Sequence, residues 1–356
     1  MPHIFDPFNL RGVTIRNRVG MPPMCQYSAR DGFANDWHQV HYGSHAVGGA
    51  GLIIVEATAV EPRGRITPND LGLWDDAQIE PLARIVRFLK EQGAVPGIQL
   101  GHAGRKASTH RPWGAPASGP LLAEDPYGWQ TVGPSPLPFS PGYPAPHQLG
   151  VEEIHMIQAA FTAAARRALA AGFEFVEIHG AHGYLLHSFY SPLSNQRSDA
   201  YGGSFENRTR FLLETTAQVR QVWPEHLPLA VRLSCTDWVD HGWNLADSVL
   251  LAGSLKDAGV DLVDCSSGGN IATPPGVTGP GYQVPFAETI RREVGIATAA
   301  VGLITTPQQA EEIIQAEKAD LVLVGRASLR NPYWPLQAAQ ELKQAIPAPG
   351  QYLRAF

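Results

Sequence analysis

The sequence predicts a (β/α)8 TIM barrel, and three observations carry that prediction. Eight short apolar runs recur along the 356 residues, helix-like segments separate them, and four of the runs follow a polar helix end that usually closes on glycine. Such barrels often exceed about 250 residues as one domain, so the length requires no second domain. An open doubly wound sheet would be expected to carry GxGxxG after an early strand, and this sequence has none.

The eight apolar runs are rich in Val, Ile and Leu and are nearly continuous rather than alternating. That pattern is typical of parallel strands that are buried on both faces. The runs are 18–24, 51–57, 95–100, 173–179, 227–234, 260–267, 297–302 and 319–325.

Helix-like segments lie between these runs. The clearest is 151–171, which places Ile154, Ile157, Phe161 and Ala165 on one face and ends at a glycine. The others are 76–92, 205–222, 245–258 and 306–317.

One connection, 101–150, is too long and too rich in Pro and Gly for a plain crossover helix. Loops of this length in compact domains are usually functional or disordered. Four aromatic residues argue against disorder, because disordered segments are poor in aromatics. The sequence therefore predicts a packed lid inserted after the third strand, with Trp113, Tyr127, Trp129 and Phe139 in it.

Charge and cysteine usage narrow the class of protein. The formal net charge is −6 and the Lys and Arg residues are scattered, which argues against nucleic acid or an anionic membrane as a partner. Three widely spaced cysteines suit a reducing compartment. The first residues lack a basic segment followed by an apolar one, and no run of eighteen apolar residues occurs. We expect a soluble, cytoplasmic protein.

Polar or backbone-exposing residues follow every predicted strand, and the C-terminal ends of the strands are where barrel enzymes place their chemistry. The last two ends carry Gly302, Gly325 and Arg326. Glycine N–H groups after the seventh and eighth strands commonly hold a phosphate, and an arginine would add a charge-assisted contact. We therefore expect a phosphate site there.

The densest group of polar residues is the segment EIHGAHGYLLHSF, 177–189. His179, His182 and Tyr184 could bring imidazole donors and a phenolic proton into one small volume. Two alternatives stay open at this point. The histidines could simply satisfy backbone carbonyls, or they could ligate zinc, although carboxylate partners at other strand ends are sparse.

Two further strand residues stand out. Arg232 lies within an apolar strand, where a charge must meet either a structural carboxylate or an electron-rich cofactor. Cys25 follows the first strand directly, whereas Cys235 and Cys265 fit the pattern of small buried apolar residues.

Taken together, these motifs resemble the old yellow enzyme family of FMN-dependent ene-reductases, in its thermophilic-like subclass. The resemblance spans the chain and includes FDPFNLRGVTIRNRVGMPPMCQYSA, GLIIVEATAVEPRGRITPNDLGLW, GIQLGHAGRKAS, FEFVEIHGAHGYLLHSFYSPLSNQRSDAYGGSFENRTRF, VDLVDCSSGG, VGRASLRNP and QYLRAF. It implies a single FMN-binding TIM barrel over 1–356. It further implies that NADPH or NADH reduces the flavin, which passes hydride to the β-carbon of an activated alkene.

The resemblance also implies roles for individual residues. Gln99 would contact the pyrimidine edge of FMN, Arg232 its N1/O2 side, and Gly302, Gly325 and Arg326 its phosphate. His179 and His182 would bind the oxygen of the substrate's carbonyl or nitro group, Tyr27 would assist, and Tyr184 would donate the proton. The residues that would line the isoalloxazine ring are Pro22, Pro23, Met24, Cys25 and Ala59, with Cys25 tuning the flavin rather than attacking substrate.

The C-terminal tail, 346–356, is the last expected feature. Pro347 and Pro349 forbid a long helix and favour an extended chain. The resemblance implies that Arg354 reaches the active site of a neighbouring subunit in a homo-oligomer built from dimers. Phe356 departs from the subclass, where tryptophan is expected, and the enlarged 107–148 loop leaves the substrate range open.

Two other enzyme classes remain as competitors. A zinc hydrolase could use the same barrel mouth, and it would be colourless and sensitive to chelators. A flavin-dependent tRNA-modifying reductase should display a basic face, which a chain of net charge −6 does not predict. A purely structural or binding role would leave the polar strand ends unexplained.

Overall fold

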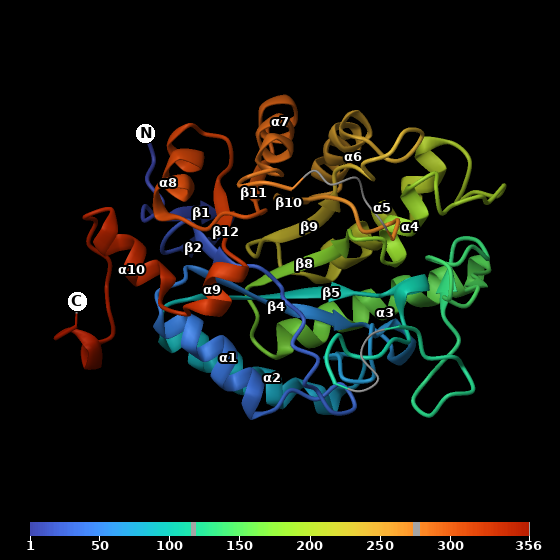
Figure 1. Cartoon of the computed structure of the whole chain (residues 1–356), viewed down its shortest axis with the longest axis horizontal. Helices are drawn as coiled ribbons and strands as arrows, with labels where there is room; N and C mark the ends of the chain where they lie inside the picture. The colour runs from blue at the N-terminus through green and yellow to red at the C-terminus, as the bar shows by residue number, and fades with distance from the viewer. Residues whose placement is uncertain (115–118, 273–277, 356) are drawn as a thin grey trace.

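Eight parallel strands close into a barrel at the centre of the molecule (Figure 1). The computed structural model describes residues 1–114, 119–272 and 278–355. Each of the eight predicted apolar runs overlaps one barrel strand. Around the barrel the strands are β3 (Val19–Met21), β4 (Leu52–Ala59), β5 (Val95–Gly101), β8 (Phe175–Gly180), β9 (Leu229–Ser234), β10 (Leu262–Ser266), β11 (Ala297–Ala300) and β12 (Leu321–Leu323), and β12 pairs with β3.

Helices pack around the outside of this barrel (Figure 1). The five predicted segments are helical and match α2 (Ile79–Glu91), α3 (Val151–Ala170), α5 (Phe205–Val222), α6 (Leu245–Asp257) and α8 (Pro307–Gln315). Five more helices are present in the described residues: α1 (Asp36–Val47), α4 (Leu185–Tyr190), α7 (Val284–Val294), α9 (Arg326–Arg330) and α10 (Trp334–Glu341). A hairpin of β1 (Phe8–Leu10) and β2 (Val13–Ile15) precedes the first barrel strand.

The helix stops confirm the repeated phrase seen in the sequence. Gly172 follows α3 with φ +91°, a left-handed conformation that glycine adopts without a steric penalty. At the corresponding place after α8 the chain has Glu317, and it adopts φ +54° even though it carries a side chain. The geometry of the turn is thus imposed by the connection between helix and strand, with or without glycine.

The inserted segment after β5 packs against the barrel through contacts of its described residues. A short parallel pair, β6 (Val132–Gly133) and β7 (His147–Gln148), stabilises it. Trp129 donates from Nε1 to the Arg63 carbonyl at 2.9 Å, and Phe139 lies under the Lys106 ammonium at 4.4 Å. The prediction of a packed segment fails for Trp113 and Tyr127, which are 49% and 82% exposed, because both rings line an open cavity instead of the core. Part of this predicted lid, 115–118, lies outside the described residues.

The C-terminal tail differs from the extended chain that we predicted. Pro349 itself is extended, with φ −54° and ψ 139°, and a single 3-10 turn follows it over Gly350–Tyr352. Tyr352 turns back toward Tyr333, with the two hydroxyl oxygens 3.4 Å apart. The tail lies at the edge of the molecule beyond α10 (Figure 1). Phe356 lies outside the described residues.

Candidate active site

Three aromatic side chains meet at the C-terminal end of β8. The His179 ring centroid lies 5.1 Å from that of His182 and 5.0 Å from that of Tyr184, with the rings nearly perpendicular. His179 is the strand residue, whereas His182 and Tyr184 come from the turn that leads into α4. The structure therefore brings together the three residues that the sequence placed in one cluster.

The two imidazoles are neutral hydrogen-bonding groups. Burial, followed by the charge of Arg232, holds the pKa of both rings well below the ordinary value. Nδ1 of His179 accepts the Ala181 N–H at 3.2 Å, so its neutral ring carries the proton on Nε2. Nε2 of His182 lies 2.7 Å from the Ser266 hydroxyl. A hydroxyl that donates there leaves the ring proton on Nδ1, where it can serve a ligand.

Lys106 holds the turn that carries His182, a role that the sequence did not predict. Its ammonium donates to the carbonyls of His182 and Gly269, each at 2.7 Å, and lies 5.1 Å from the Tyr184 ring centroid. His182 adopts φ +60°, a conformation that needs such support in a residue with a side chain. Burial, and then Arg105, lowers the pKa of Lys106 to about 7. Its only sequence signal is a lysine in GHAGRKAS, shortly after a buried strand.

Tyr184 is a neutral phenol at any physiological pH. Burial, and then the proximity of Cys25, raises its pKa well above the ordinary value. Tyr27 is affected in the same way: burial, then Cys25 and Tyr184, raises its pKa. Tyr27 and Cys25 therefore lie close to Tyr184. The loop that follows β3, here called the first-strand loop, carries Cys25 and Tyr27. It faces the turn that follows β8 across the C-terminal opening of the barrel, here called the mouth.

Cys25 is a protonated thiol in this environment. Burial raises its pKa well above the ordinary value, and the nearby acids Asp70 and Glu56 raise it further. A thiol without a thiolate form is a poor nucleophile. The following residue, Gln26, is fixed because its N–H donates to Glu56 Oε2 at 2.8 Å, and Tyr42 donates its hydroxyl proton to the other oxygen at 2.9 Å.

Arg232 meets a carboxylate, so one of the two sequence alternatives is present in the structure. Its Nε lies 2.9 Å from Asp264 Oδ2, and both side chains are buried. Gln99 donates from Nε2 to Glu177 at 2.7 Å beside this pair. Burial, and then Asp264, raises the pKa of Glu177. In the described part of the chain, the terminal guanidinium nitrogens of Arg232 donate no hydrogen bond. They are therefore available for an electron-rich cofactor, the other partner that the sequence allowed.

The last two strand ends lie side by side, because β11 pairs with β12. Gly302 follows β11 with φ +125°, and Gly325 precedes α9, which begins at the exposed Arg326. A Cβ built on Gly325 would lie 3.6 Å from Pro22 Cγ and 3.7 Å from Met24 Sδ. The first-strand loop therefore borders this end of the mouth, as expected for residues predicted to share one ligand.

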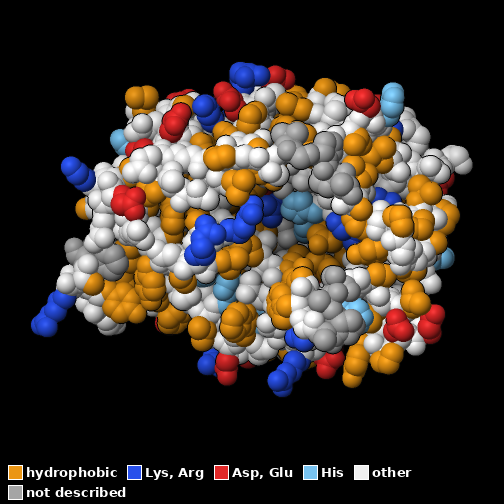
Figure 2. All heavy atoms as spheres, viewed as in Figure 1, with side chains coloured by type: hydrophobic (Ala, Val, Ile, Leu, Met, Phe, Trp, Pro, Cys, Tyr) orange, Lys and Arg blue, Asp and Glu red, His pale blue; other side chains and the backbone are white. Residues whose placement is uncertain are grey.

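Of the remaining predicted residues, Pro23 and Ala59 lie at the C-terminal end of the barrel, and Arg354 does not. Pro23 lies in the first-strand loop, and Ala59 ends β4 and is buried. Arg354 is exposed in the C-terminal tail, and no contact joins it to the histidine cluster of the same chain. Figure 2 shows a face that is hollowed near its centre, with histidine inside the hollow and Lys or Arg beside it.

The donor set at the mouth fits a flat, electron-rich ring that carries a phosphate. Arg232 offers free guanidinium N–H groups at one edge, and Gln99 retains an amide oxygen that accepts no hydrogen bond from the described residues. A glycine pair and an arginine stand at the other end. Within residues 1–114, 119–272 and 278–355, no group of three or more His, Cys, Asp and Glu side chains is arranged to hold a metal ion. No helix in the same ranges is long and apolar enough to cross a membrane.

Comparison with known proteins agrees with this geometry. Residues 3–345 match the NADH:flavin oxidoreductase / NADH oxidase family. The NADPH dehydrogenase of Geobacillus thermodenitrificans (strain NG80-2) is 49% identical over 355 residues, which cover 99% of this chain and 98% of that protein. Among solved structures, morphinone reductase superposes with a TM-score of 0.81 at 28% identity, covering 98% of this chain and 91% of that one. An old yellow enzyme homologue from Zymomonas mobilis gives 0.78 at 26% identity, covering 98% and 94%.

A TIM barrel with this site defines a flavin-dependent oxidoreductase. The chain belongs to the NADH:flavin oxidoreductase / NADH oxidase family, and the resemblance to old yellow enzymes is confirmed. Its cofactor is FMN, with a reduced nicotinamide nucleotide as electron donor.

Proposed function

We propose that this protein is an ene-reductase that reduces alkenes conjugated to a carbonyl or nitro group, with NADPH as the donor. The observation that carries the proposal is the mutual approach of His179, His182 and Tyr184, two neutral imidazoles and one neutral phenol around a single point. The name of the Geobacillus relative supports NADPH. When bound, FMN supplies the hydride that passes from the nicotinamide to the β-carbon of the alkene.

Residues at the strand ends hold that cofactor in our proposal. Gln99 contacts its pyrimidine edge, and Arg232 turns its free N–H groups toward the electron-rich N1/O2 side. Gly302, Gly325 and Arg326 bind its phosphate. The ring is lined by Pro22, Pro23, Met24, Cys25 and Ala59. Because Cys25 is a neutral thiol, its role is to tune the ring's environment rather than to form a bond with substrate.

The histidine pair binds the substrate oxygen. His179 donates from Nε2, because its Nδ1 accepts the Ala181 N–H. In our proposal His182 donates from Nδ1, with its Nε2 accepting the Ser266 hydroxyl proton, so that two N–H groups face the atom on which negative charge develops. Their depressed pKa values keep them neutral, which avoids placing two cations beside Arg232 in a buried site. Tyr27 closes the opposite side of the substrate.

Tyr184 delivers the proton to the α-carbon. Its partly buried phenol lies beside the histidine pair and remains protonated, so a proton is available wherever a carbanion develops within reach. The raised pKa makes the phenol a weak acid, and we infer that the Lys106 ammonium, 5.1 Å from the ring centroid, favours the phenolate that forms when the proton leaves.

Two variants test this division of roles by stopped-flow spectroscopy of each half-reaction. Tyr184→Phe should leave the rate of flavin reduction by NADPH within about twofold and slow the reoxidation by 2-cyclohexenone. His182→Ala should slow the same step by about 10²–10³, because one donor to the substrate oxygen is lost. Phenols that stack on the flavin with their oxygen at the histidine pair give a long-wavelength absorbance, and the variant should lose this band.

A matched control is Tyr201→Phe, which removes a hydroxyl that donates to Glu214 on α5 at 2.8 Å, outside the barrel mouth. It should behave as wild type. Wild-type enone reduction by Tyr184→Phe would show that another group or water supplies the proton. An unchanged phenol band in His182→Ala would contradict the oxygen-binding role.

A further inference from the structure

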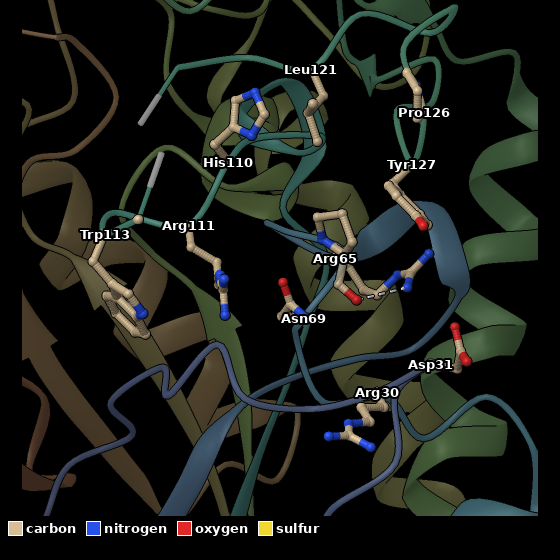
Figure 3. A pocket seen from close by; sticks show the side chains of 12 residues that line it. Arg30, Asp31, Arg65, Asn69, His110, Arg111, Trp113, Leu121, Pro126 and Tyr127 are labelled. Carbon is tan, nitrogen blue, oxygen red and sulfur yellow. Dashed lines mark hydrogen bonds between the residues drawn. The ribbon is translucent and has the colours of Figure 1, made fainter. Parts of the chain in front are cut away.

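A second cavity opens beside the active site, with a volume of about 680 Å³. The loops after three consecutive barrel strands, β3, β4 and β5, supply its walls. Figure 3 shows that the side chains on these loops point into one space from several sides. The walls include Arg30, Arg65, Arg111, Trp113 and Tyr127.

Arg65 is a cation fixed in advance on one wall. Its guanidinium lies 5.4 Å from the Trp74 ring centroid and 5.0 Å from that of Trp129, and so sits between two indoles. Nε donates to the Pro62 carbonyl at 2.8 Å. Burial lowers the pKa of Arg65, yet a guanidinium stays protonated at neutral pH. An arginine held in this way needs little ordering to bind an anion.

Two more arginines reach the cavity from other loops. Arg30 and Arg111 are exposed, and in the described residues their guanidinium groups form no hydrogen bond and no ion pair. Asp31 is the one acid on the described walls, and His110 lies among them. The buried Asp70 also acts on Arg65 from behind the wall, so three guanidinium groups face two carboxylates, which still leaves an excess of positive charge.

Aromatic surface accompanies this charge and leads to the active site. Trp113 is 49% exposed and Tyr127 is 82% exposed, so both rings can accept a stacked partner. The Trp113 ring also packs edge-on against Tyr27, with centroids 5.6 Å apart. Tyr27 borders the catalytic mouth, so a molecule lying in the cavity can extend past this residue toward the flavin.

We propose that this cavity binds the 2′-phosphoadenosine end of NADPH, with Arg30, Arg65 and Arg111 around the 2′-phosphate and the adenine against Trp113 or Tyr127. The inference rests on the proposed function, in which NADPH is the donor. Planar guanidinium forks match phosphate geometry, and the 2′-phosphate is the group that distinguishes NADPH from NADH. Three converging arginines thereby become a means of choosing between the two nucleotides.

The test uses the FMN-loaded enzyme and two fragments that cannot reduce a flavin. Calorimetry should show that adenosine 2′-monophosphate binds more tightly than adenosine 5′-monophosphate and loses affinity as salt increases. In the Arg30→Ala/Arg111→Ala variant, the affinity for the 2′-monophosphate should fall about tenfold or more. The ratio of kcat/KM for NADPH to that for NADH should fall by a similar factor.

Arg166→Ala is the matched control, because this arginine is exposed on α3 and likewise has no ion pair in the described residues. It should retain the wild-type ratio. Equal affinity for the two monophosphates, or an equal loss of NADPH and NADH efficiency in the double variant, would overturn the assignment. A wild-type enzyme whose flavin neither nucleotide reduces would instead overturn the proposed function, so the two failures are distinguishable.

Discussion

The titratable residues at the centre of this active site are uncharged at neutral pH. His179, His182, Tyr184 and Cys25 all titrate in ordinary peptides, and burial keeps each of them neutral here. A neutral imidazole or phenol can donate a hydrogen bond to a carbonyl oxygen, and a neutral phenol can give up its proton, without a charged side chain having to be buried first. The functional side chains therefore depend on the positions of the remaining cations, above all Lys106 and Arg232.

Lys106 gives the sharpest prediction at this scale. Its pKa of about 7 means that the ammonium is present below pH 7 and is lost as the pH rises through that value. The His182 and Gly269 carbonyls then lose a cationic donor, and Tyr184 loses the charge over its ring. Enone reduction by wild type should fall above pH 7, and Lys106→Met should be slower by about tenfold with no inflection there.

Stopped-flow pH profiles of the oxidative half-reaction provide the measurement. Lys256→Met is the control, because that lysine also donates to a carbonyl, that of Val294 at 2.8 Å, but on the outer surface. A Lys106→Met profile that superposes on the wild-type curve would show that the ammonium does not act on the site.

At the scale of elements, the sequence predicts the barrel well because strands and connecting helices obey simple patterns. Each apolar run became a strand, and the repeated glycine stop marked the helix ends. Helix α1 escaped prediction because its buried face is polar: His38, Tyr42 and His45 face inward, and Tyr42 bonds the buried Glu56. A hydrophobic pattern cannot identify a helix whose buried face contacts a carboxylate.

The helix stops allow a stability prediction. Glu317 occupies the left-handed position that glycine fills after α3, and its ion pair with Arg291 is long, at 3.7 Å, and exposed. Glu317→Gly should therefore stabilise the protein by about 0.5–1 kcal/mol. Gly172→Ala should do the opposite, because the new Cβ meets Val86 at 3.3 Å with φ at +91°.

Chemical denaturation of both variants measures the effect. A loss of stability in Glu317→Gly would show that the exposed carboxylate contributes more than the strained backbone costs.

The sequence predicted a residue of the candidate site only where that residue belongs to a recognisable motif at a strand end. The histidine cluster, Arg232 and the glycine ends could be named because each stands at a strand terminus. Lys106 and the Glu177 partner of Gln99 could not be identified from the sequence. Glu177 meets Gln99 because of the register in which β5 pairs with β8, and Lys106 meets the His182 and Gly269 carbonyls because three loops converge at the mouth. No local sequence pattern encodes the register of two paired strands or the convergence of loops.

At the scale of the whole molecule, the C-terminal tail suggests an assembly. Leu353 is 63% exposed and Tyr352 is 39% exposed, an apolar surface at the edge of the subunit beside Arg354. We propose that this tail enters the active site of a neighbouring subunit, with Arg354 contacting substrate there. Deletion of residues 351–356 should leave FMN bound, and it should raise KM for enones several-fold or weaken the dimer.

Light scattering and steady-state kinetics report both effects, and Arg354→Ala separates them by removing the charge while keeping the apolar contact. A native mass equal to one chain, or a truncated dimer with unaltered kinetics, would contradict the assembly.

Electron transfer from NADPH to an activated alkene through bound FMN can be tested directly by an anaerobic absorption titration of the purified protein. We expect a flavin band that bleaches with one equivalent of NADPH and returns with one equivalent of 2-cyclohexenone, which is converted to cyclohexanone. A colourless protein, or a reduced flavin that the enone fails to reoxidise while oxygen does, would contradict this expectation.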